Sequence, residues 1–329
     1  MLSGISTGSG TGSQTGSGTG SQTGSGTGSD NIVAATGMVA YAGLLPSPLI
    51  TQALLDNRSK LVLGAPGLPA ATPFAAPGTD SDLPKWDHEV RFLMCVSQFF
   101  EGLDFAFSSG TATITHTSGA HKIIVRAPPQ ITQADVQHVL DEAVNRQDRF
   151  SEILAQVAVP ISFYASVLNL SPERHKQVFE LIDVVLRIGK VCVFRLKHHF
   201  NCARPADLSP AVQPMLATPG HGSFPSGHST ETRFLTEILK HVLEQLARTH
   251  PSCARAPSVT LTCDLLDKLA DRIGRNRVVA GLHFKFDHDE GAKLGDDLAK
   301  HFKARVSSTT APANLLGWLV NRSVQQLKD

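Results

Sequence analysis

The chain has 329 residues, 41% of them hydrophobic, which is enough to bury one large core or two smaller ones. Its formal net charge is +1, so no global basic field indicates a nucleic-acid or anionic-membrane partner. The five cysteines are odd in number and lack Cys-x-x-Cys spacing, which is typical of free thiols in a reducing compartment.

The first quarter of the chain carries little helical pattern. Residues 8–29 repeat Gly-Ser-Gly-Thr-Gly-Ser-Gln-Thr nearly three times and offer no core side chains, so we assign residues 1–29 to a disordered tail. Residues 30–84 are rich in Ala, Leu, Pro and Gly and predict an extended segment that packs on the core.

Neither a membrane span nor a signal peptide is expected. The apolar stretch from Ile32 to Leu55 is interrupted by glycines and prolines and never reaches the roughly 18 to 20 apolar residues that a span needs. The N-terminus lacks the basic start and short apolar core of a signal peptide. Cytoplasm is therefore the expected location.

Residues 85–329 are assigned to one helical domain. Helical spacing begins near Asp87, and the alternation within residues 111–125 predicts a small β-hairpin. Thr132 with Asp135 resembles a capping box that opens the next helix. Ser171-Pro172, Thr262 and Pro312 are expected to open three further helices.

The longest of these helices carries one apolar stripe that ends at Lys197. Its members recur at three-and-four spacing: Val178, Leu181, Ile182, Val185, Ile188, Gly189, Cys192 and Leu196. The expected fold class is therefore a mainly α helical bundle with an anion site at the ends of its core helices. Exposed apolar stripes on such a surface favour a homodimer.

Three short segments between residues 197 and 287 carry the candidate chemistry. In the first, Lys197 and Arg204 are seven residues apart, which on a continuous helix places both on one face, two turns apart. Because Arg204 precedes a proline, the helix is expected to end there. Both cations could then reach one ligand.

The other two segments combine a helix start with a broken helix. Ser226 is expected to be an N-cap, whose free N–H groups and partial positive charge suit an anion. Arg277 and His283 are six residues apart, about 240° on a straight helix, so the chain has to break between them, and Gly281 is the expected position. Asp287 follows His283 by four residues and could hold one imidazole nitrogen.

Permanent cations, a helix start and histidines at one point are what a tetrahedral oxyanion needs. Taken singly, each residue also fits a structural role: Lys197 as a solvated charge, Arg204 as a helix cap, His283 as a core histidine. Together, in this order and spacing, they predict a pocket for a phosphate-like anion.

The ordered set resembles a known signature. Lys-x6-Arg-Pro, Pro-Ser-Gly-His and Arg-x3-Gly-x-His-x3-Asp are similar to motifs shared by type 2 phosphatidic acid phosphatases, soluble bacterial acid phosphatases and vanadium-dependent haloperoxidases. The signature covers about residues 190–295, and the likeness to soluble bacterial haloperoxidase-type proteins extends from about Trp86. Asn276 is a departure, because the family often has Ser at that position.

The resemblance implies a role for each motif residue. His283 would be the axial ligand of vanadium in a haloperoxidase, or the nucleophile that forms a phosphohistidine in a phosphatase. Asp287 would orient His283, and His228 would be the general acid or base, accepting a proton from hydrogen peroxide or donating one to a leaving alkoxide. The oxygens of vanadate or phosphate would be bound by four side chains and one amide: Lys197, Arg204, Ser226, Arg277 and Gly227.

Two features bear on which reaction is catalysed. His221, seven residues before His228, resembles the histidine of bromide-oxidising members, while the stretch 222–228 also resembles soluble acid phosphatases. The expected function is a vanadium-dependent haloperoxidase that oxidises halide, bromide rather than chloride, with hydrogen peroxide. The alternatives are a cofactor-free acid phosphatase acting on phosphomonoesters through His283, and a non-catalytic oxyanion-binding protein.

Overall fold

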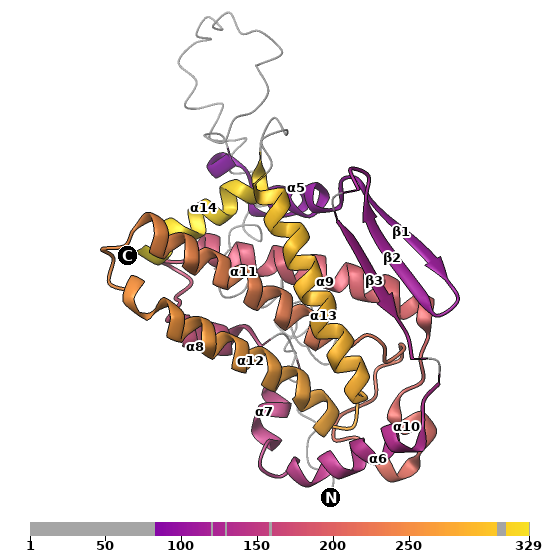
Figure 1. The fold of residues 1–329 in the computed structure, drawn as a ribbon. Coiled ribbons are helices and arrows are strands. Elements are labelled where there is room, and N and C mark those ends of the chain that lie inside the picture. The colour runs from indigo at the N-terminus through magenta and orange to yellow at the C-terminus, as the bar shows by residue number, and fades with distance from the viewer. Residues whose placement is uncertain (1–82, 120, 129, 158–159, 308–313, 329) are drawn as a thin grey trace, which may run out of the picture.

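The computed structural model describes residues 83–119, 121–128, 130–157, 160–307 and 314–328 (Figure 1). The expectations for residues 1–29, for 30–82 and for Pro312 as a helix start lie outside these ranges. The described chain is mainly α-helical with one small sheet, as expected. Among its helices, none combines the length and apolar content needed to cross a membrane.

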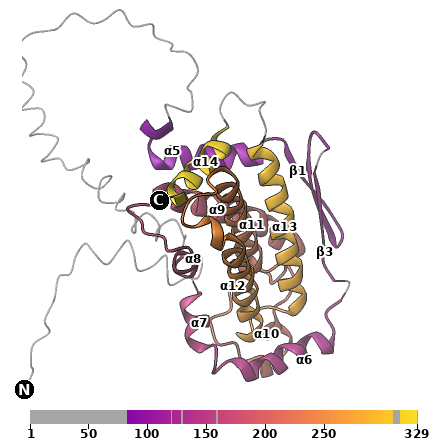
Figure 2. The ribbon, with the colours of Figure 1, turned by 60° about the vertical axis from the view of Figure 1, so that its left-hand side comes forward.

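Helix α11 (Gly227–Thr249) lies at the centre of the bundle (Figures 1 and 2). Its apolar side chains at three-and-four spacing, from Phe234 to Leu246, are fully buried. Five longer helices surround it or pack on its neighbours: α5 (His88–Phe100), α9 (Lys176–Phe200), α12 (Val259–Val279), α13 (Lys285–Val306) and α14 (Leu315–Lys328).

Three of the four shorter helices, within residues 133–155 and 205–208, cover the end of the bundle at which α12 terminates and α13 begins, and the fourth packs along α12 nearer its start. The predicted capping box is confirmed, because Asp135 Oδ2 accepts a hydrogen bond from the Thr132 backbone N–H at 2.7 Å. The short helices are α6 (Gln133–Glu142), α7 (Phe150–Ala155), α8 (Ile161–Leu168) and α10 (Pro205–Leu208), with 3-10 turns at Leu83–Lys85, Ala143–Asn145, Pro210–Val212 and Ala256–Ser258.

The predicted hairpin is part of a three-stranded antiparallel sheet. Strands β2 (Thr111–His116) and β3 (Lys122–Arg126) pair with Ile114 opposite Ile123. A further strand, β1 (Leu103–Ser108), pairs with β2 and makes the order β1-β2-β3. The sheet packs on α13, and Ile114 and Ile123 are buried there. The alternation Leu-Asp-Phe-Ala-Phe-Ser in β1 is a strand signal that the hairpin prediction missed.

Two helix starts differ from the predicted positions. Helix α9 begins at Lys176, not at Ser171, because the Ser171 backbone N–H donates to His175 Nδ1 at 2.9 Å and the intervening residues form turns. Helix α12 begins at Val259, three residues before Thr262, directly after a 3-10 turn. The predicted apolar stripe of α9 is confirmed, since all its residues are buried.

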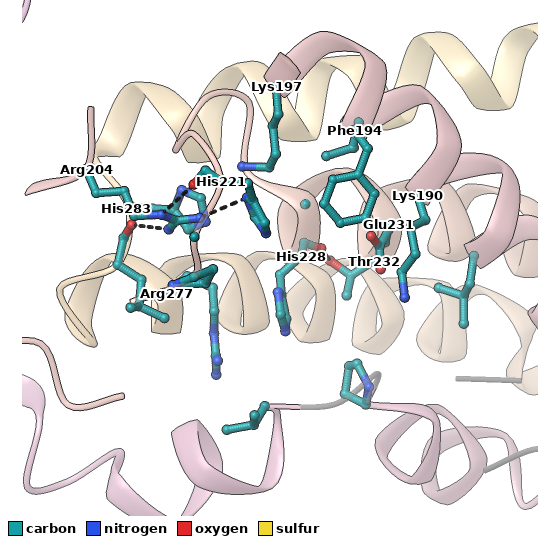
Figure 3. A pocket seen from close by; sticks show the side chains of 18 residues that line it. Lys190, Phe194, Lys197, Arg204, His221, His228, Glu231, Thr232, Arg277 and His283 are labelled. Atoms are coloured by element: carbon teal, nitrogen blue, oxygen red, sulfur yellow. Dashed lines mark hydrogen bonds between the residues drawn. The ribbon is translucent and has the colours of Figure 1, made fainter. Parts of the chain in front are cut away.

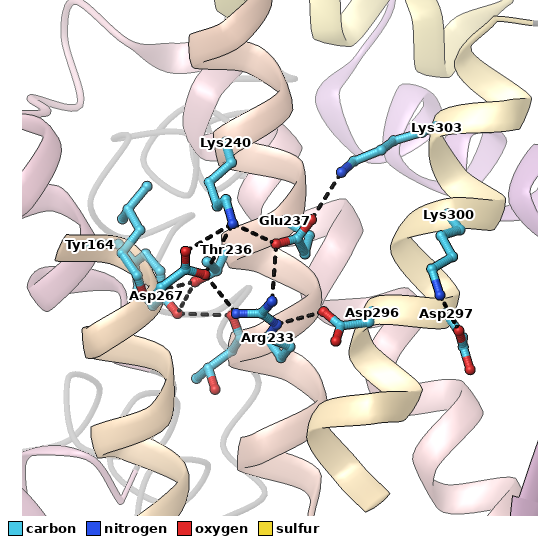
Figure 4. A network of polar contacts seen from close by, with 12 residues as sticks. Tyr164, Arg233, Thr236, Glu237, Lys240, Asp267, Asp296, Asp297, Lys300 and Lys303 are labelled. Carbon is cyan, nitrogen blue, oxygen red and sulfur yellow. Dashed lines mark hydrogen bonds and ion pairs between the residues drawn. The ribbon is translucent and has the colours of Figure 1, made fainter. Parts of the chain in front are cut away.

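An ion network joins α11, α12 and α13 midway along the bundle (Figure 4). Arg233 of α11 donates to Asp267 of α12 at 2.6 Å and to Asp296 of α13 at 2.5 Å. Lys240 and Lys303 pair with Glu237 of α11 at 2.9 and 3.0 Å. Each cation of this network therefore faces carboxylates from its own or a neighbouring helix.

Candidate oxyanion site

A cavity of about 350 Å³ lies between the C-terminal half of α9, the start of α11 and the turn between α12 and α13 (Figure 3). Most of the candidate site residues line it: Lys197, Arg204, His221, Gly227, His228, Arg277 and His283. Ser226 and Asp287 are not among the lining residues; both are fully buried behind it.

Lys197 lies in the last turn of α9 and lines the cavity. Only 3% of the residue is exposed, and Nζ donates to the carbonyl oxygens of Gly222 and Ser223 at 2.8 and 2.6 Å. Burial, and then the nearby Arg204 charge, lower the pKa of Lys197. Among the described residues Lys197 has no carboxylate within ion-pairing distance.

Arg204 reaches the same cavity by a different route from the one predicted. Helix α9 ends at Phe200, because Asn201 adopts the left-handed conformation with φ of 44°, so Lys197 and Arg204 do not share one helix face. Arg204 instead precedes α10 at its N-terminus, and the loop turns it back toward Lys197. Its guanidinium donates to the carbonyls of His221 and Leu282 at 3.0 and 2.8 Å.

The expected break between Arg277 and His283 occurs at Gly281. This residue has φ of +80°, which favours glycine, and an added Cβ would lie 2.8 Å from Arg146 Nη2, so that the guanidinium would have to shift. Arg146 secures the turn from outside, with Nε donating to the Val279 carbonyl at 2.9 Å. Arg277 at the end of α12 and His283 before α13 therefore face one cavity.

His283 is held in one orientation by Asp287. Its Nδ1 lies 3.0 Å from Asp287 Oδ2, which also accepts the Phe284 backbone N–H at 2.9 Å and so caps α13. Burial raises the pKa of Asp287, and in its ionised form the carboxylate accepts the Nδ1 proton, so that the Nε2 atom keeps its lone pair. Burial, followed by Lys197 and Arg204, lowers the pKa of His283 well below 6.5, so the imidazole is neutral.

The start of α11 presents Gly227, not the Ser226 side chain, to the cavity. The Ser226 hydroxyl accepts the Ser229 backbone N–H at 3.4 Å and the Ser229 hydroxyl at 3.0 Å, as an N-cap does. It therefore shapes the helix start from behind, and the amide end of α11 supplies the partial positive charge.

His228 and Arg277 both bond to the segment at the end of α7. His228 Nε2 lies 2.9 Å from the Gln156 carbonyl oxygen, and Arg277 Nη2 donates to the Ile153 carbonyl at 3.0 Å. Burial and the Arg277 charge lower the pKa of His228 to about 3. Asn276 donates to the Gln156 side chain at 2.9 Å, where the resemblance led us to expect a serine.

His221 lies at the rim of the cavity. It is exposed, its ring meets Phe194 edge-on with centroids 5.1 Å apart, and its Nδ1 is 3.3 Å from Arg204 Nη2. Burial of part of the ring, with Lys197 and Arg204 nearby, lowers the pKa of His221 despite a bond to the Gly222 carbonyl.

Three lining residues at the far end of the cavity were not among those predicted from the sequence. Figure 3 shows Lys190, Glu231 and Thr232 opposite the end that holds Arg204 and His283. Burial raises the pKa of Glu231 to about 7. Helical spacing could have indicated them, because Lys190 precedes Lys197 by seven residues and Glu231 follows His228 by three.

The chain was compared with known proteins. Residues 206–311 match the family model described as the VCPO second helical-bundle domain. Among solved structures, the chain is similar to a transmembrane PAP2-type phosphatidylglycerolphosphate phosphatase from Bacillus subtilis, with 17% identity over 68% of this chain and 97% of that one, and a TM-score of 0.42. It is also similar to a bacterial vanadium-dependent iodoperoxidase, with 15% identity over 54% of this chain and 51% of that one, and a TM-score of 0.40. No curated protein matches the sequence.

Proposed function

We propose that the chain is an enzyme of the superfamily of type 2 phosphatidic acid phosphatases and vanadium haloperoxidases, and that it binds a tetrahedral oxyanion beside His283. The match of residues 206–311 to the VCPO second helical-bundle domain supports this proposal. The observation that carries this proposal is the geometry of His283, which lines the cavity and whose Nδ1 lies 3.0 Å from Asp287 Oδ2, an arrangement that leaves Nε2 for a ligand. Such an imidazole can ligate vanadium or attack phosphorus.

The charge of the cavity supports an anion as its occupant. Lys190, Lys197, Arg204 and Arg277 line it, and Glu231 is the one carboxyl among its described lining residues. Arg277 Nε is buried and has no hydrogen-bond partner among the described residues. An orphaned donor of this kind is costly unless a ligand satisfies it, so the donor set fits vanadate or phosphate.

Of the two reactions, we propose halide oxidation first. The support is the family-model match, which is to a domain named for VCPO, together with His221 at the cavity rim. Vanadate would be held by His283, Lys197, Arg204 and Arg277, and when bound it supplies a Lewis-acid centre that activates hydrogen peroxide toward bromide. The protein's own part is to neutralise the anion's charge, fix the His283 tautomer through Asp287, and move protons through His228.

Phosphomonoester hydrolysis is the second candidate, and the extent of the cavity favours it. Beyond the cations the wall continues over the apolar side chains of Leu186, Val193 and Phe194, which offer space for an organic group. His283 would then be the nucleophile and no cofactor would be needed.

A paired assay separates these functions. Peroxide-dependent bromination is measured after loading with orthovanadate, and p-nitrophenyl phosphate hydrolysis is measured without vanadate. Bromination that requires vanadate and is lost in His228→Ala, but kept in His198→Ala on the exposed face of α9, supports the haloperoxidase. Hydrolysis that vanadate inhibits, without bromination, supports the phosphatase. If vanadate binds without any turnover, the protein is an oxyanion binder and the enzymatic proposal fails.

A further inference from the structure

Glu231 is a carboxyl inside a cavity built for an anion. Its stem packs over Gly189 of α9, where an added Cβ would lie 3.4 Å from Glu231 Cγ. Its Oε1 atom lies 3.6 Å from the position of a Cβ on Gly227, so the carboxyl sits beside the amide end of α11. A second negative charge at this point opposes the oxyanion that the cations attract.

The charged groups that act on this carboxyl all come from α9. Lys190 and Lys197 favour its ionised form, but burial outweighs both and raises the pKa of Glu231 to about 7. Glu231 forms no hydrogen bond or ion pair with the described residues that would fix it in either protonation state. It is thus free to gain or lose a proton near neutral pH.

The position of Glu231 relative to His283 indicates which atom of a bound ligand would receive the Glu231 proton. Figure 3 places His283 at one end of the cavity and Glu231 at the other, with His228 between them. In an in-line displacement the attacking and departing atoms lie on opposite sides of the central atom. A group attacked by His283 therefore has its departing oxygen on the side away from His283, and Glu231 lies at the far end of the cavity on that side, beyond His228.

His228, the other proton carrier at the site, is differently constrained. Its Nε2 is bonded to the Gln156 carbonyl oxygen, and its pKa of about 3 makes it neutral and a weak proton donor at pH 7. At neutral pH, the carboxyl of Glu231 holds a proton more readily than the imidazole of His228 does, because its pKa is higher.

We propose that Glu231 is a second proton carrier of this site: it takes up a proton when an oxyanion binds and delivers it to the oxygen that departs on the side away from His283. This inference rests on the proposed oxyanion pocket. In the phosphatase reaction, His283 Nε2 bonds to phosphorus as the bond to the departing oxygen breaks, and that oxygen takes the Glu231 proton. Water then replaces the histidine at phosphorus and returns a proton to the Glu231 carboxylate.

Proton uptake on binding is the first test, and it needs no turnover. Tungstate is the probe, because it is a tetrahedral dianion that carries no proton near pH 7.5. Calorimetry in two buffers of different ionisation enthalpy gives the protons taken up per tungstate bound. We expect between about half and one proton for the unaltered protein, and the same for Glu244→Gln on the exposed face of α11. Glu231→Gln is expected to take up less, with the remaining uptake due to Lys197 and Asp287, which can also gain protons beside a bound anion. At pH 8.5 this variant should bind tungstate about tenfold more tightly.

The outcomes separate the two proposals. Equal proton uptake in Glu231→Gln and Glu244→Gln overturns the role of Glu231 while leaving the oxyanion pocket in place. No tungstate binding in any variant overturns the pocket, and the role of Glu231 with it.

A second test uses leaving groups and applies when the protein hydrolyses phosphomonoesters. p-Nitrophenolate departs with little help from an acid, whereas an alkoxide needs a proton. Glu231→Gln should therefore lower kcat/KM for an alkyl phosphate by about 100-fold and for p-nitrophenyl phosphate only a few-fold. A loss that is equal for both substrates would point to a positional effect and contradict proton delivery.

Discussion

The oxyanion pocket lies at the start of α11 and the ion network lies midway along it, and the cations of the two regions have different partners. In the ion network, Arg233, Lys240 and Lys303 are matched by carboxylates of three helices. In the pocket, Lys197 and Arg204 donate to backbone carbonyls instead, and neither forms an ion pair with a carboxylate of the described residues. Paired charges hold helices together, whereas unpaired buried cations create a demand for an anion.

Loss of the axial partner should break the pocket most completely. In His283→Ala the cavity keeps its cations but loses the imidazole Nε2, so vanadate affinity should fall more than about 100-fold and turnover should disappear, since even outer-shell changes cost 10- to 100-fold. Equilibrium binding of orthovanadate measures this. His198→Ala is the control, and retained affinity in His283→Ala would contradict the assignment of His283.

A matched pair of charge deletions tests the comparison directly. Lys197→Met should weaken tungstate binding about 10- to 100-fold, since a charge-assisted hydrogen bond contributes roughly 1.5 to 3 kcal/mol. Arg233→Met should leave tungstate affinity unchanged and lower the free energy of unfolding by about 1 to 2 kcal/mol, because the ion network is partly exposed. Urea unfolding and binding are measured on both. A loss of tungstate binding in Arg233→Met, with unchanged binding in Lys197→Met, would contradict the different roles assigned to the pocket and the ion network.

The turn at Gly281 sharpens the comparison by testing geometry instead of charge. Gly281→Ala should lower the free energy of unfolding by about 1 to 3 kcal/mol. It should also weaken tungstate binding, because the new Cβ displaces Arg146 from the turn that positions Arg277 and His283. Gly110→Ala is the control: φ there is +69°, yet nothing lies within 4 Å of its added Cβ. Thermal unfolding should show a smaller loss for Gly110→Ala and no loss of binding. An equal effect in both variants would mean that backbone strain alone matters.

A dependence of stability on pH is also expected. The pKa of His228 is lowered to about 3, so between pH 6.5 and 3 the unfolded chain binds a proton that the folded chain refuses. This contribution is fully present above pH 6.5 and is lost as pH falls toward 3. His228→Asn should flatten the curve in that window, measured by urea unfolding at several pH values, while Arg233→Met should keep its shape. An unchanged slope in His228→Asn would contradict the assignment.

The sequence predicted the parts of the site that depend on local geometry. Ser226 as an N-cap, the break at Gly281 and the reach from Asp287 to His283 all follow from spacing and backbone preference. The long stripe of α9 and the mainly α bundle were predictable for the same reason.

The remainder depended on tertiary contacts that spacing does not encode. Asn201 adopts the left-handed conformation and ends α9 before Arg204. Arg204 therefore lies in a loop, and not on the helix face of Lys197 that the seven-residue spacing predicted. Likewise, no local pattern predicts the hydrogen bond between the Gln156 carbonyl and His228, which are 72 residues apart in the sequence. Glu231 was not predicted, because a carboxyl is not expected among the residues that bind an anion.

The end of α7 has a consequence for how tightly the pocket can hold its ligand. The single proton on His228 Nε2 serves either the Gln156 carbonyl or an incoming oxygen. When the ligand takes it, the carbonyl must find water or another donor. The measured affinity then reflects the bond from His228 to the ligand minus the bond from His228 to the Gln156 carbonyl. A substitution that loosens residues 153–156 should therefore strengthen ligand binding, although these residues do not contact the ligand.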